Sequence, residues 1–284
     1  MERDYGIFIL SNGRAGNVST IKMLKKGGVI GKRHVHILID DEDSQGQEYY
    51  KLYGDMVVQF YKKDYDNRVD TMDNNGNRKC VVYARNAVFD IAKEMGYKHF
   101  IVLDDDYKEV EIRYKQGKKL KCYAVKDLEH LNQIMFDFLD CANILTVCLG
   151  QGGDFIGGAN GGNANKVLSR KAMNYWYCRT DRPFEFMGRM NEDATANVVY
   201  GIRGGLMFTA MQTCLIPGTT QKIPGGLTDI YLEKGTYSKS LYTVMAEPSC
   251  TKISVMQTKH KRVHHFIEWR YCCPKIINEK WKKR

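Results

Sequence analysis

The chain has 284 residues, of which 43% are hydrophobic, and its formal net charge at pH 7 is +10. This length and composition suffice for a substantial buried core, but no apolar run reaches the roughly 18 residues that a membrane-spanning helix needs. The excess of positive charge predicts attraction to a polyanionic partner at low salt.

The first half of the chain alternates predicted strands and helices. The strands are short continuous apolar runs, typical of a buried parallel sheet, and the helices repeat apolar residues at helical spacing. We expect strands over 5–10, 35–39, 56–61 and 100–103, and helices over 19–26, with Ser19 as N-cap, over 45–53 and from Val82 to Gly96. The alternation predicts an α/β fold, with a mostly parallel central sheet flanked by helices on both faces.

The second half begins with a predicted hairpin and therefore adds a small antiparallel part. Its strands are expected over 110–114 and 120–123, followed by a helix over 125–141, a strand over 144–149 and a helix from 192 to about 200. The glycine-rich segment 150–163 is either a flexible linker or a loop that closes over a polar substrate. We find no interdomain linker and expect one domain over residues 1–284.

The nine cysteines are scattered along the sequence and none forms a Cys-x-x-Cys pair. We expect them to be reduced and mostly buried, as in a cytoplasmic protein, without a structural metal site. The N-terminus enters a predicted strand at once, so we expect no secretory signal.

Polar residues follow the first two predicted strands. Ser11, Asn12 and Arg14 come directly after the first strand, and Asp40 ends the second. Because ligands of open α/β sheets bind at the carboxyl ends of the strands, these residues are candidates to hold a nucleotide. The glycines between them allow close approach of the backbone, and Arg14 can pair with phosphate.

A strand ending in three carboxylates is the strongest feature of the chain. Asp104, Asp105 and Asp106 close the apolar run 100–103, and Arg85 and Asn86 lie in the helix before it. Three adjacent acids repel one another, and a divalent cation carrying a diphosphate would offset that cost. The alternative is an acidic turn exposed to water.

This arrangement resembles the nucleotide-sugar glycosyltransferases of the GT-A fold, which carry an Arg-Asn helix before an Asp-x-Asp strand. The resemblance implies that Asp106 ligates Mn²⁺ or Mg²⁺, while Asp104 faces the ribose or a metal-bound water. Asp105 is then a spacer or a contact to the donor sugar. Arg85 and Asn86 would orient the nucleotide and the Asp side chains.

The same resemblance extends to Asn191-Glu192-Asp193, since inverting GT-A enzymes begin a helix with an x-Glu-Asp motif that carries the general base. Acids in the first turn of a helix also interact favourably with the helix dipole, so the alternative is that both residues have only a structural role. Either acid can take the proton from an acceptor hydroxyl, and we favour Asp193. Many GT-A enzymes complete the metal shell with a C-terminal His, which His264 or His265 would supply, and Lys239 would contact the donor phosphates from a loop.

Residues Tyr5 to Ile277 also resemble the TET-associated glycosyltransferases of phages. The shared features are Tyr-Ala-Arg-Asn, Leu-Asp-Asp-Asp, Asn-Glu-Asp and a His-His tail followed by Pro274-Lys275-Ile276-Ile277. The resemblance implies a UDP-sugar donor, a modified DNA duplex carrying 5-hydroxymethylpyrimidine as acceptor, and the cytoplasm of a bacterial host. It divides the domain into a nucleotide-sugar-binding half, 1–107, and an acceptor-side half, 108–284.

Two other functions remain open at this point. A family-2-like glycosyltransferase would use a glycan, lipid or protein hydroxyl as acceptor. A basic α/β module that only binds nucleic acid would leave the Asp cluster without a use. The aromatic residues Phe155, Tyr175, Trp176 and Tyr177 could stack on bases, although aromatics at this spacing more often belong to a core.

Overall fold

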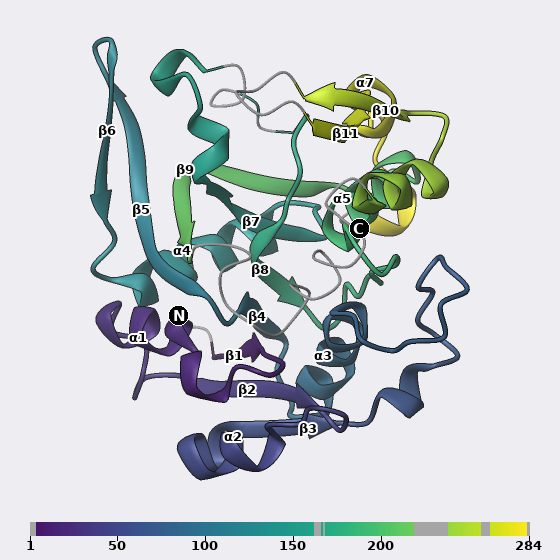
Figure 1. Ribbon diagram of the computed structural model, residues 1–284. Helices are drawn as coiled ribbons and strands as arrows, with labels where there is room; N and C mark the ends of the chain where they lie inside the picture. The colour runs from purple at the N-terminus through teal and green to yellow at the C-terminus, as the bar shows by residue number, and fades with distance from the viewer. Residues whose placement is uncertain (1–3, 162–165, 167, 219–237, 257–261, 283–284) are drawn as a thin grey trace.

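The computed structural model describes residues 4–161, 166, 168–218, 238–256 and 262–282. Within them, nine strands form one mixed sheet in the order β3-β2-β1-β4-β8-β7-β9-β5-β6 (Figure 1). The strands are β1 (Tyr5–Leu10), β2 (His34–Asp40), β3 (Val57–Phe60), β4 (His99–Asp104), β5 (Tyr107–Gln116), β6 (Lys119–Ala124), β7 (Thr146–Gln151), β8 (Asn174–Arg179) and β9 (Met207–Pro217).

The four strands β3, β2, β1 and β4 are parallel, as their continuous apolar sequences predict. Strand β8 is antiparallel to both β4 and β7, whereas β7 and β9 are parallel to each other. The predicted hairpin is present as β5 and β6, and it extends the sheet at the far edge. The predicted α/β fold class is therefore confirmed, and the four parallel strands form one half of a mixed sheet that ends at β3.

Helices cover both faces of the sheet, and alternate residues of β1 show the division. Tyr5, Ile7 and Ile9 pack in one core with α1 (Ser19–Lys26), α2 (Gly46–Tyr53) and α4 (Leu128–Cys141). Phe8 and Leu10 pack in the other with α3 (Val82–Glu94) and α5 (Glu192–Ile202). This two-sided burial explains why the strands read as continuous apolar runs.

A smaller antiparallel pair, β10 (Thr251–Met256) and β11 (Arg262–Ile267), is followed by the short helix α7 (Trp269–Cys272). Cys250, Ile267 and Cys272 of this part pack on Ala194 and Val198 of α5. The C-terminal part therefore lies on the helix that carries the Glu-Asp motif (Figure 1).

Three local predictions need correction. Helix α4 begins at Leu128 rather than at 125, because Asp127 is its N-cap and accepts from the His130 N–H at 3.0 Å. Ser19 is the first residue of α1 rather than its N-cap, and its hydroxyl donates to the Asp105 carbonyl oxygen at 3.3 Å. Lys239 lies in the helical residues 238–246 and not in a loop.

The aromatic residues suggested for base stacking belong to the core. Tyr175, Trp176 and Tyr177 are buried in β8, and the two tyrosine hydroxyls both donate to Asn132 Oδ1, at 3.0 and 2.8 Å. Phe155 is also buried, against Met211 and Cys214. Their interpretation as a base-stacking platform is wrong, since none of these faces is accessible to a base.

The cysteines and the hydropathy of the helices can be compared with the expectations from composition. All nine cysteines are free, and six of them are buried, as expected of reduced thiols in a core. Among the residues that the structure describes, no helix is long and apolar enough to cross a membrane.

Candidate active site

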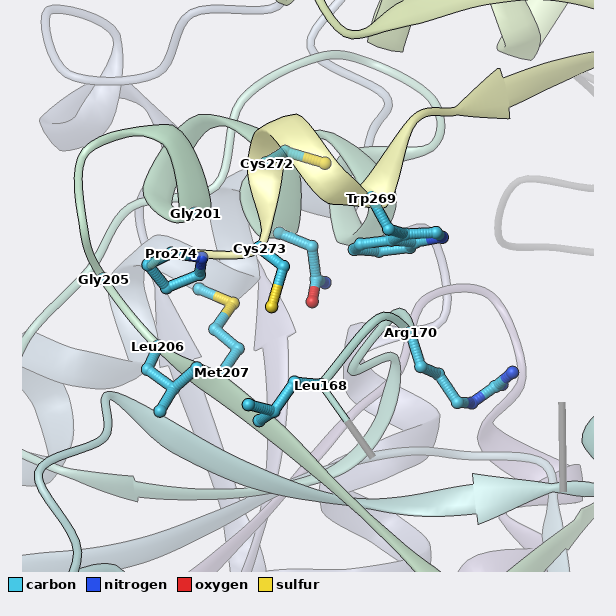
Figure 2. A pocket seen from close by; sticks show the side chains of 11 residues that line it. Leu168, Arg170, Gly201, Gly205, Leu206, Met207, Trp269, Cys272, Cys273 and Pro274 are labelled. Carbon is cyan, nitrogen blue, oxygen red and sulfur yellow. The ribbon is translucent and has the colours of Figure 1, made fainter. Parts of the chain in front are cut away.

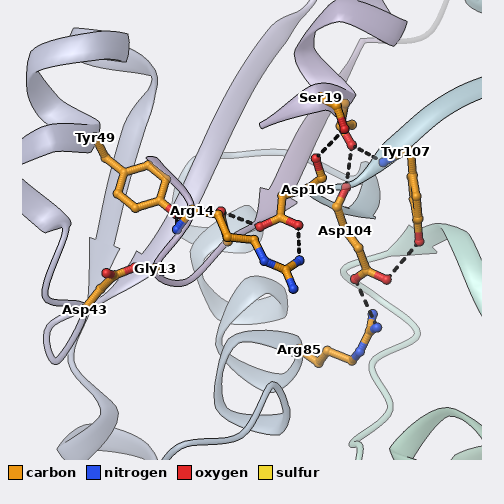
Figure 3. Close-up of polar contacts among 11 residues, drawn as sticks. Gly13, Arg14, Ser19, Asp43, Tyr49, Arg85, Asp104, Asp105 and Tyr107 are labelled. Carbon is orange, nitrogen blue, oxygen red and sulfur yellow. Dashed lines mark hydrogen bonds and ion pairs between the residues drawn. The ribbon is translucent and has the colours of Figure 1, made fainter. Parts of the chain in front are cut away.

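The polar residues at the ends of β1, β2 and β4 meet at one edge of the sheet, as predicted. Asn12 Nδ2 donates to Asp40 Oδ2 at 2.9 Å, and Ser11 Oγ donates to Asp105 Oδ2 at 2.6 Å. Arg14 Nη1 pairs with Asp105 Oδ1 at 2.8 Å (Figure 3). The turn after β1 is thus tied to the second strand end and to the acid cluster.

Two residues that the sequence analysis missed hold this turn in place. The Tyr49 hydroxyl accepts from the Arg14 N–H at 2.9 Å and lies 2.6 Å from Ser11 Oγ. Asp43 Oδ2 accepts from the N–H of Gly13, which has a φ of 67° (Figure 3). The positive φ at Gly13 turns its N–H toward Asp43, a conformation that glycine adopts without strain.

Asp40 and Asp105 are both engaged by protein groups. Besides Asn12, Asp40 is paired with the buried ammonium of Lys62, with 3.0 Å between Lys62 Nζ and Asp40 Oδ1. Asp105 is buried between Ser11 and Arg14, and its burial raises the pKa of the carboxyl although Arg14 opposes the shift. This position agrees with a spacer that anchors the acid cluster.

Asp104 and Asp106 differ from Asp105 in their exposure and partners. The Asp104 side chain is 33% exposed, its Oδ1 accepts from Arg85 Nη2 at 3.1 Å, and its Oδ2 accepts from the Tyr107 hydroxyl at 3.0 Å (Figure 3). No other residue that the structure describes forms a hydrogen bond or ion pair with the Asp106 side chain. Burial, together with the charges of Asp104 and Asp105, raises the pKa of Asp106 to about 6.

Those surroundings fit a divalent cation. An ionised Asp106 carboxylate beside two other acids is unfavourable unless a positive charge accompanies it, and carboxylate oxygens are the ligands that Mg²⁺ and Mn²⁺ prefer. The partly exposed Asp104 carboxylate, two positions earlier in the sequence, would offer further oxygen atoms.

Arg85 connects the acid cluster to the Glu-Asp motif. Its Nε donates to Glu192 Oε1 at 3.0 Å while its Nη2 donates to Asp104, so one buried guanidinium serves both. Asn86 has a structural task, because its side chain bonds the backbone N–H and carbonyl of Phe186 at 2.8 and 3.0 Å. The sequence analysis therefore located Arg85 at the site, whereas Asn86 fixes the segment that leads to α5.

The two acids that begin α5 have different environments. Glu192 is buried, and burial together with the nearby charge of Asp193 raises its pKa to about 7 against the opposing effect of Arg85. Asp193 is partly exposed, and its Oδ1 accepts from the N–H of Ala194 at 2.6 Å. Asp193 is therefore the more accessible of the two to an acceptor hydroxyl.

The His-His pair lies beside α5 and contacts a lysine that the sequence analysis did not identify. The His265 Nε2 atom is 3.3 Å from Lys171 Nζ, and His265 Nδ1 is 3.3 Å from Asn191 Nδ2. Burial, with the charge of Lys171 next in importance, lowers the pKa of His265 to about 2. The imidazole is therefore neutral, which is the form that binds metals.

His264 stacks on its neighbour, with 4.2 Å between the ring centroids of His264 and His265. In the described part of the chain, no three His, Cys, Asp or Glu side chains converge in a geometry that could hold a metal ion. The structure therefore does not bring the two histidines and the Asp104–Asp106 carboxylates into one shell.

Tyr107 and Lys171 are the functional candidates without a usable sequence signal. Tyr107 reads as the first apolar residue of a strand, yet its buried hydroxyl positions Asp104. Lys171 follows Arg170 after the glycine-rich loop, and burial lowers its pKa although Asp193 opposes the shift. The Lys171–His265 contact joins segments 94 positions apart, whereas Tyr107 contacts Asp104 only three residues before it.

A small pocket lies elsewhere, between the start of β9 and α7 (Figure 2). Leu168, Met207, Trp269 and Cys273 are part of its lining. None of the residues predicted for donor, metal or acceptor lines it, so we do not assign it to the active site.

The sequence pattern that gives this geometry is shared with one known family. The sequence model of the TET-associated glycosyltransferase family matches residues 5–226. No curated protein matches the chain. The match includes the acid cluster, Arg85 and the Glu-Asp motif.

Several solved structures have a similar fold. The S. aureus TarS fragment 1–349 in complex with UDP-GlcNAc has 10% sequence identity and a TM-score of 0.50, over 86% of this chain and 66% of that one. A longer S. aureus TarS structure has 10% identity and a TM-score of 0.46, over 81% of this chain and 38% of TarS. Glucosyl-3-phosphoglycerate synthase from Mycobacterium tuberculosis with Mg²⁺ and UDP has 9% identity and a TM-score of 0.49, over 93% and 88%. The chain thus spans less than two thirds of the TarS chains, and the likeness concerns the GT-A fold.

Proposed function

The chain belongs to the TET-associated glycosyltransferase family, and we propose that it transfers a sugar from a UDP-sugar to the hydroxyl of 5-hydroxymethylpyrimidine in phage DNA. Its membership makes it a glycosyltransferase and removes the alternative of a non-enzymatic binding module. We propose, in addition, a donor nucleotide, a metal, an acceptor and a role for each site residue.

The observation that carries the proposal is the bridge formed by Arg85. It joins Asp104, at the end of β4, to Glu192, at the start of α5, through contacts of 3.1 and 3.0 Å. The Asp104 carboxylate, which we assign to the cation, and the helix that carries the proposed general base are therefore held in one ionic unit. Glycosyl transfer from a nucleotide diphosphate needs both of these elements.

We assign the donor to the edge formed by Ser11, Asn12, Arg14 and Asp40. Strand ends of an open α/β sheet are the usual place for a nucleotide, and the guanidinium of Arg14 can pair with phosphate. The TarS fragment of similar fold was solved with UDP-GlcNAc, which supports a uridine diphosphate sugar as the donor. Lys239 is the proposed contact to the donor phosphates, and residues 1–107 form the donor half.

We assign Mn²⁺ or Mg²⁺ to Asp106 and Asp104, with His264 or His265 as a further ligand when the donor is present. The high pKa of Asp106 and its lack of a partner in the described chain support this assignment. When bound, the cation would neutralise charge on the leaving diphosphate.

The acceptor-side half, 108–284, supplies the base. The acceptor oxygen attacks the anomeric carbon from the face opposite the diphosphate, and Asp193 takes the proton of the hydroxyl. The new carbon–oxygen bond forms as the bond to the diphosphate breaks, and the nucleoside diphosphate leaves with the bonding electrons. Configuration is inverted because attack and departure occur on opposite faces.

The acceptor is the least constrained part of the proposal. The net charge of +10 favours a polyanion such as DNA, and the family is named for its association with TET. A glycan, lipid or protein hydroxyl, as in family-2-like enzymes, is the competing acceptor. We expect the reaction to occur in the cytoplasm of the bacterial host.

A transfer assay tests the proposal directly. The protein is incubated with Mn²⁺, a panel of UDP-sugars and duplex DNA containing cytosine or 5-hydroxymethylcytosine, and the nucleosides are weighed by mass spectrometry. A sugar-sized mass increase on the modified base alone supports the proposal. UDP release without modification of DNA would agree with the proposed UDP-sugar donor and metal, and it would exclude DNA as the acceptor.

A further inference from the structure

The β5–β6 hairpin is formed by the last two strands in the order of the large sheet. It stands at the edge of the sheet, and its tip projects past the neighbouring strands (Figure 1). Strand β5 begins at Tyr107, directly after Asp106, and has 10 residues. At about 3.3 Å per residue, the hairpin therefore reaches roughly 33 Å from the acid cluster.

One face of the hairpin contacts the rest of the protein, although Lys115 and Cys122 on this face remain exposed. The cross-strand pairs Arg113–Cys122 and Lys115–Leu120 lie on this face. Leu120 packs against the buried cluster of Phe155, and the Arg113 guanidinium lies 4.8 Å from the centre of the Phe155 ring. Lys115 Nζ donates to Asn160 Oδ1 at 3.1 Å. These contacts rest the hairpin on the glycine-rich segment.

The opposite face is open and carries aromatic and basic side chains. It contains the pairs Ile112–Tyr123, Tyr114–Lys121 and Gln116–Lys119, none of which includes an acid. Tyr114 is 43% and Tyr123 56% exposed, and their ring centroids are 6.0 Å apart. Lys118 in the turn, Lys119 and Lys121 are all exposed.

Protection of a sheet edge explains only part of this face. Lysines on an edge strand prevent pairing with a second chain, and β6 is such a strand. This explanation covers Lys119 and Lys121, but it gives no reason to keep two tyrosines in contact with water. Lysine ammonium and tyrosine hydroxyl groups are both regular donors to DNA phosphates.

We propose that the open face of the hairpin binds the phosphate backbone of duplex DNA. This inference rests on the proposed function and names the surface that holds the acceptor outside the active site. A hairpin of roughly 33 Å matches one turn of duplex, about 34 Å. A duplex with its target nucleotide at the acid cluster would thus meet Tyr123 at about 20 Å, Tyr114 and Lys121 at about 26 Å, and Lys118 and Lys119 about one turn away.

Two charge-matched variants test the inference. The hairpin variant carries Lys118→Gln, Lys119→Gln and Lys121→Gln, and the control carries Lys51→Gln, Lys63→Gln and Lys93→Gln, which lie on exposed positions of other elements. Both variants have three fewer positive charges than the wild type. The dissociation constant of a 30-base-pair duplex with one 5-hydroxymethylcytosine is measured by fluorescence anisotropy at several salt concentrations, beside UDP release without DNA.

The hairpin variant should bind the duplex at least ~10-fold more weakly, and the slope of log affinity against log salt should fall by about 0.9 for each phosphate that the variant no longer neutralises. The control should stay close to the wild type, and UDP release should be unchanged in both. A second variant, Tyr114→Ser with Tyr123→Ser, should also weaken binding without removing any charge.

Equal affinities and slopes for the hairpin variant and the control would overturn the inference, even if the wild-type protein glycosylates the duplex. A wild-type protein that neither binds nor modifies the duplex would overturn both the inference and the proposed acceptor. If only the hairpin variant lost binding and the wild type transferred no sugar, the hairpin would be supported as the DNA-binding surface. The same result would reject 5-hydroxymethylcytosine as the acceptor.

Discussion

The guanidinium of Arg85 donates from Nε to Oε1 of Glu192 across 3.0 Å, and the two residues are 107 positions apart in the sequence. Both side chains are buried, so water screens the attraction between the two charges less than at a surface ion pair. Because Arg85 also holds Asp104, the acid cluster and the start of α5 respond together to any change at this residue.

Replacement of Arg85 by Met should destabilise the protein by about 3–5 kcal/mol, because it leaves Glu192 buried without a cationic partner. The double replacement Arg85→Met with Glu192→Leu should recover part of that loss, since it removes the unpaired acid. Chemical denaturation measures the free energy of unfolding of both variants. If Arg85→Met lowered the free energy of unfolding by less than about 1 kcal/mol, the pair would contribute no more to stability than a surface ion pair does.

The assignment of the base is tested by two isosteric changes. Asp193→Asn should leave the affinity for the UDP-sugar nearly unchanged and lower turnover by at least ~100-fold, which is the usual contribution of general-base catalysis. Glu192→Gln is the control, because Gln keeps the shape and can still accept from Arg85. If Glu192→Gln abolished turnover while Asp193→Asn did not, the base would be Glu192.

The metal assignment predicts that Asp106→Ala abolishes Mn²⁺-dependent donor binding and transfer. Titration calorimetry with UDP and Mn²⁺ measures binding separately from turnover. Asp90→Ala, at a partly exposed carboxylate on α3, is the control for general loss of negative charge and should bind UDP and Mn²⁺ normally. Full activity of Asp106→Ala would contradict the assigned role.

The raised pKa of Asp106 also predicts a pH-dependent stability of the metal-free protein. Its pKa of about 6 lies above the ordinary value of 3.8, so the folded state binds the proton more tightly than the unfolded state. This contribution to stability is complete below pH 3.8 and is lost as the pH rises through 6. Asp106→Asn should therefore raise the thermal midpoint at pH 7.5, and the gain should shrink as the pH falls toward 4. An equal gain at both pH values would show that ionisation of Asp106 is not responsible.

Local sequence patterns predicted the strands β1 to β7, the main helices and the acid cluster because each depends on neighbouring residues, whereas β8 and β9 were not predicted. The apolar run before Asp104 and the helical spacing after Val82 are such patterns. They could not predict that β8 lies antiparallel between β4 and β7, since strand pairing is a long-range choice. The contact of Lys171 with His265 was missed for the same reason, since the two residues are 94 positions apart. Tyr107 was missed although Asp104 lies only three residues before it, because an apolar strand position gives no sign of where the hydroxyl points.

The environment of the Glu-Asp motif depends on packing that a single glycine permits. A Cβ atom at Gly201 of α5 would overlap the backbone carbonyl oxygen of Cys272 in α7. Gly201→Ala must therefore push α7 and the preceding strand β11 away from α5, at a cost of about 1–3 kcal/mol. Chemical denaturation measures this loss.

Gly46→Ala is the matched control, because a Cβ atom at Gly46 makes only one ordinary contact, at 3.9 Å from Ile39. That change, in the first turn of α2, should be neutral or stabilise by up to about 1 kcal/mol. Since β11 carries His265, displacement of α7 should also disturb the His265–Lys171 contact and raise the pKa of the imidazole from about 2. Histidine resonances followed by NMR across a pH titration report that change. Equal stabilities of the two alanine variants, with an unshifted His265, would mean that α5 and α7 separate without consequence for the site.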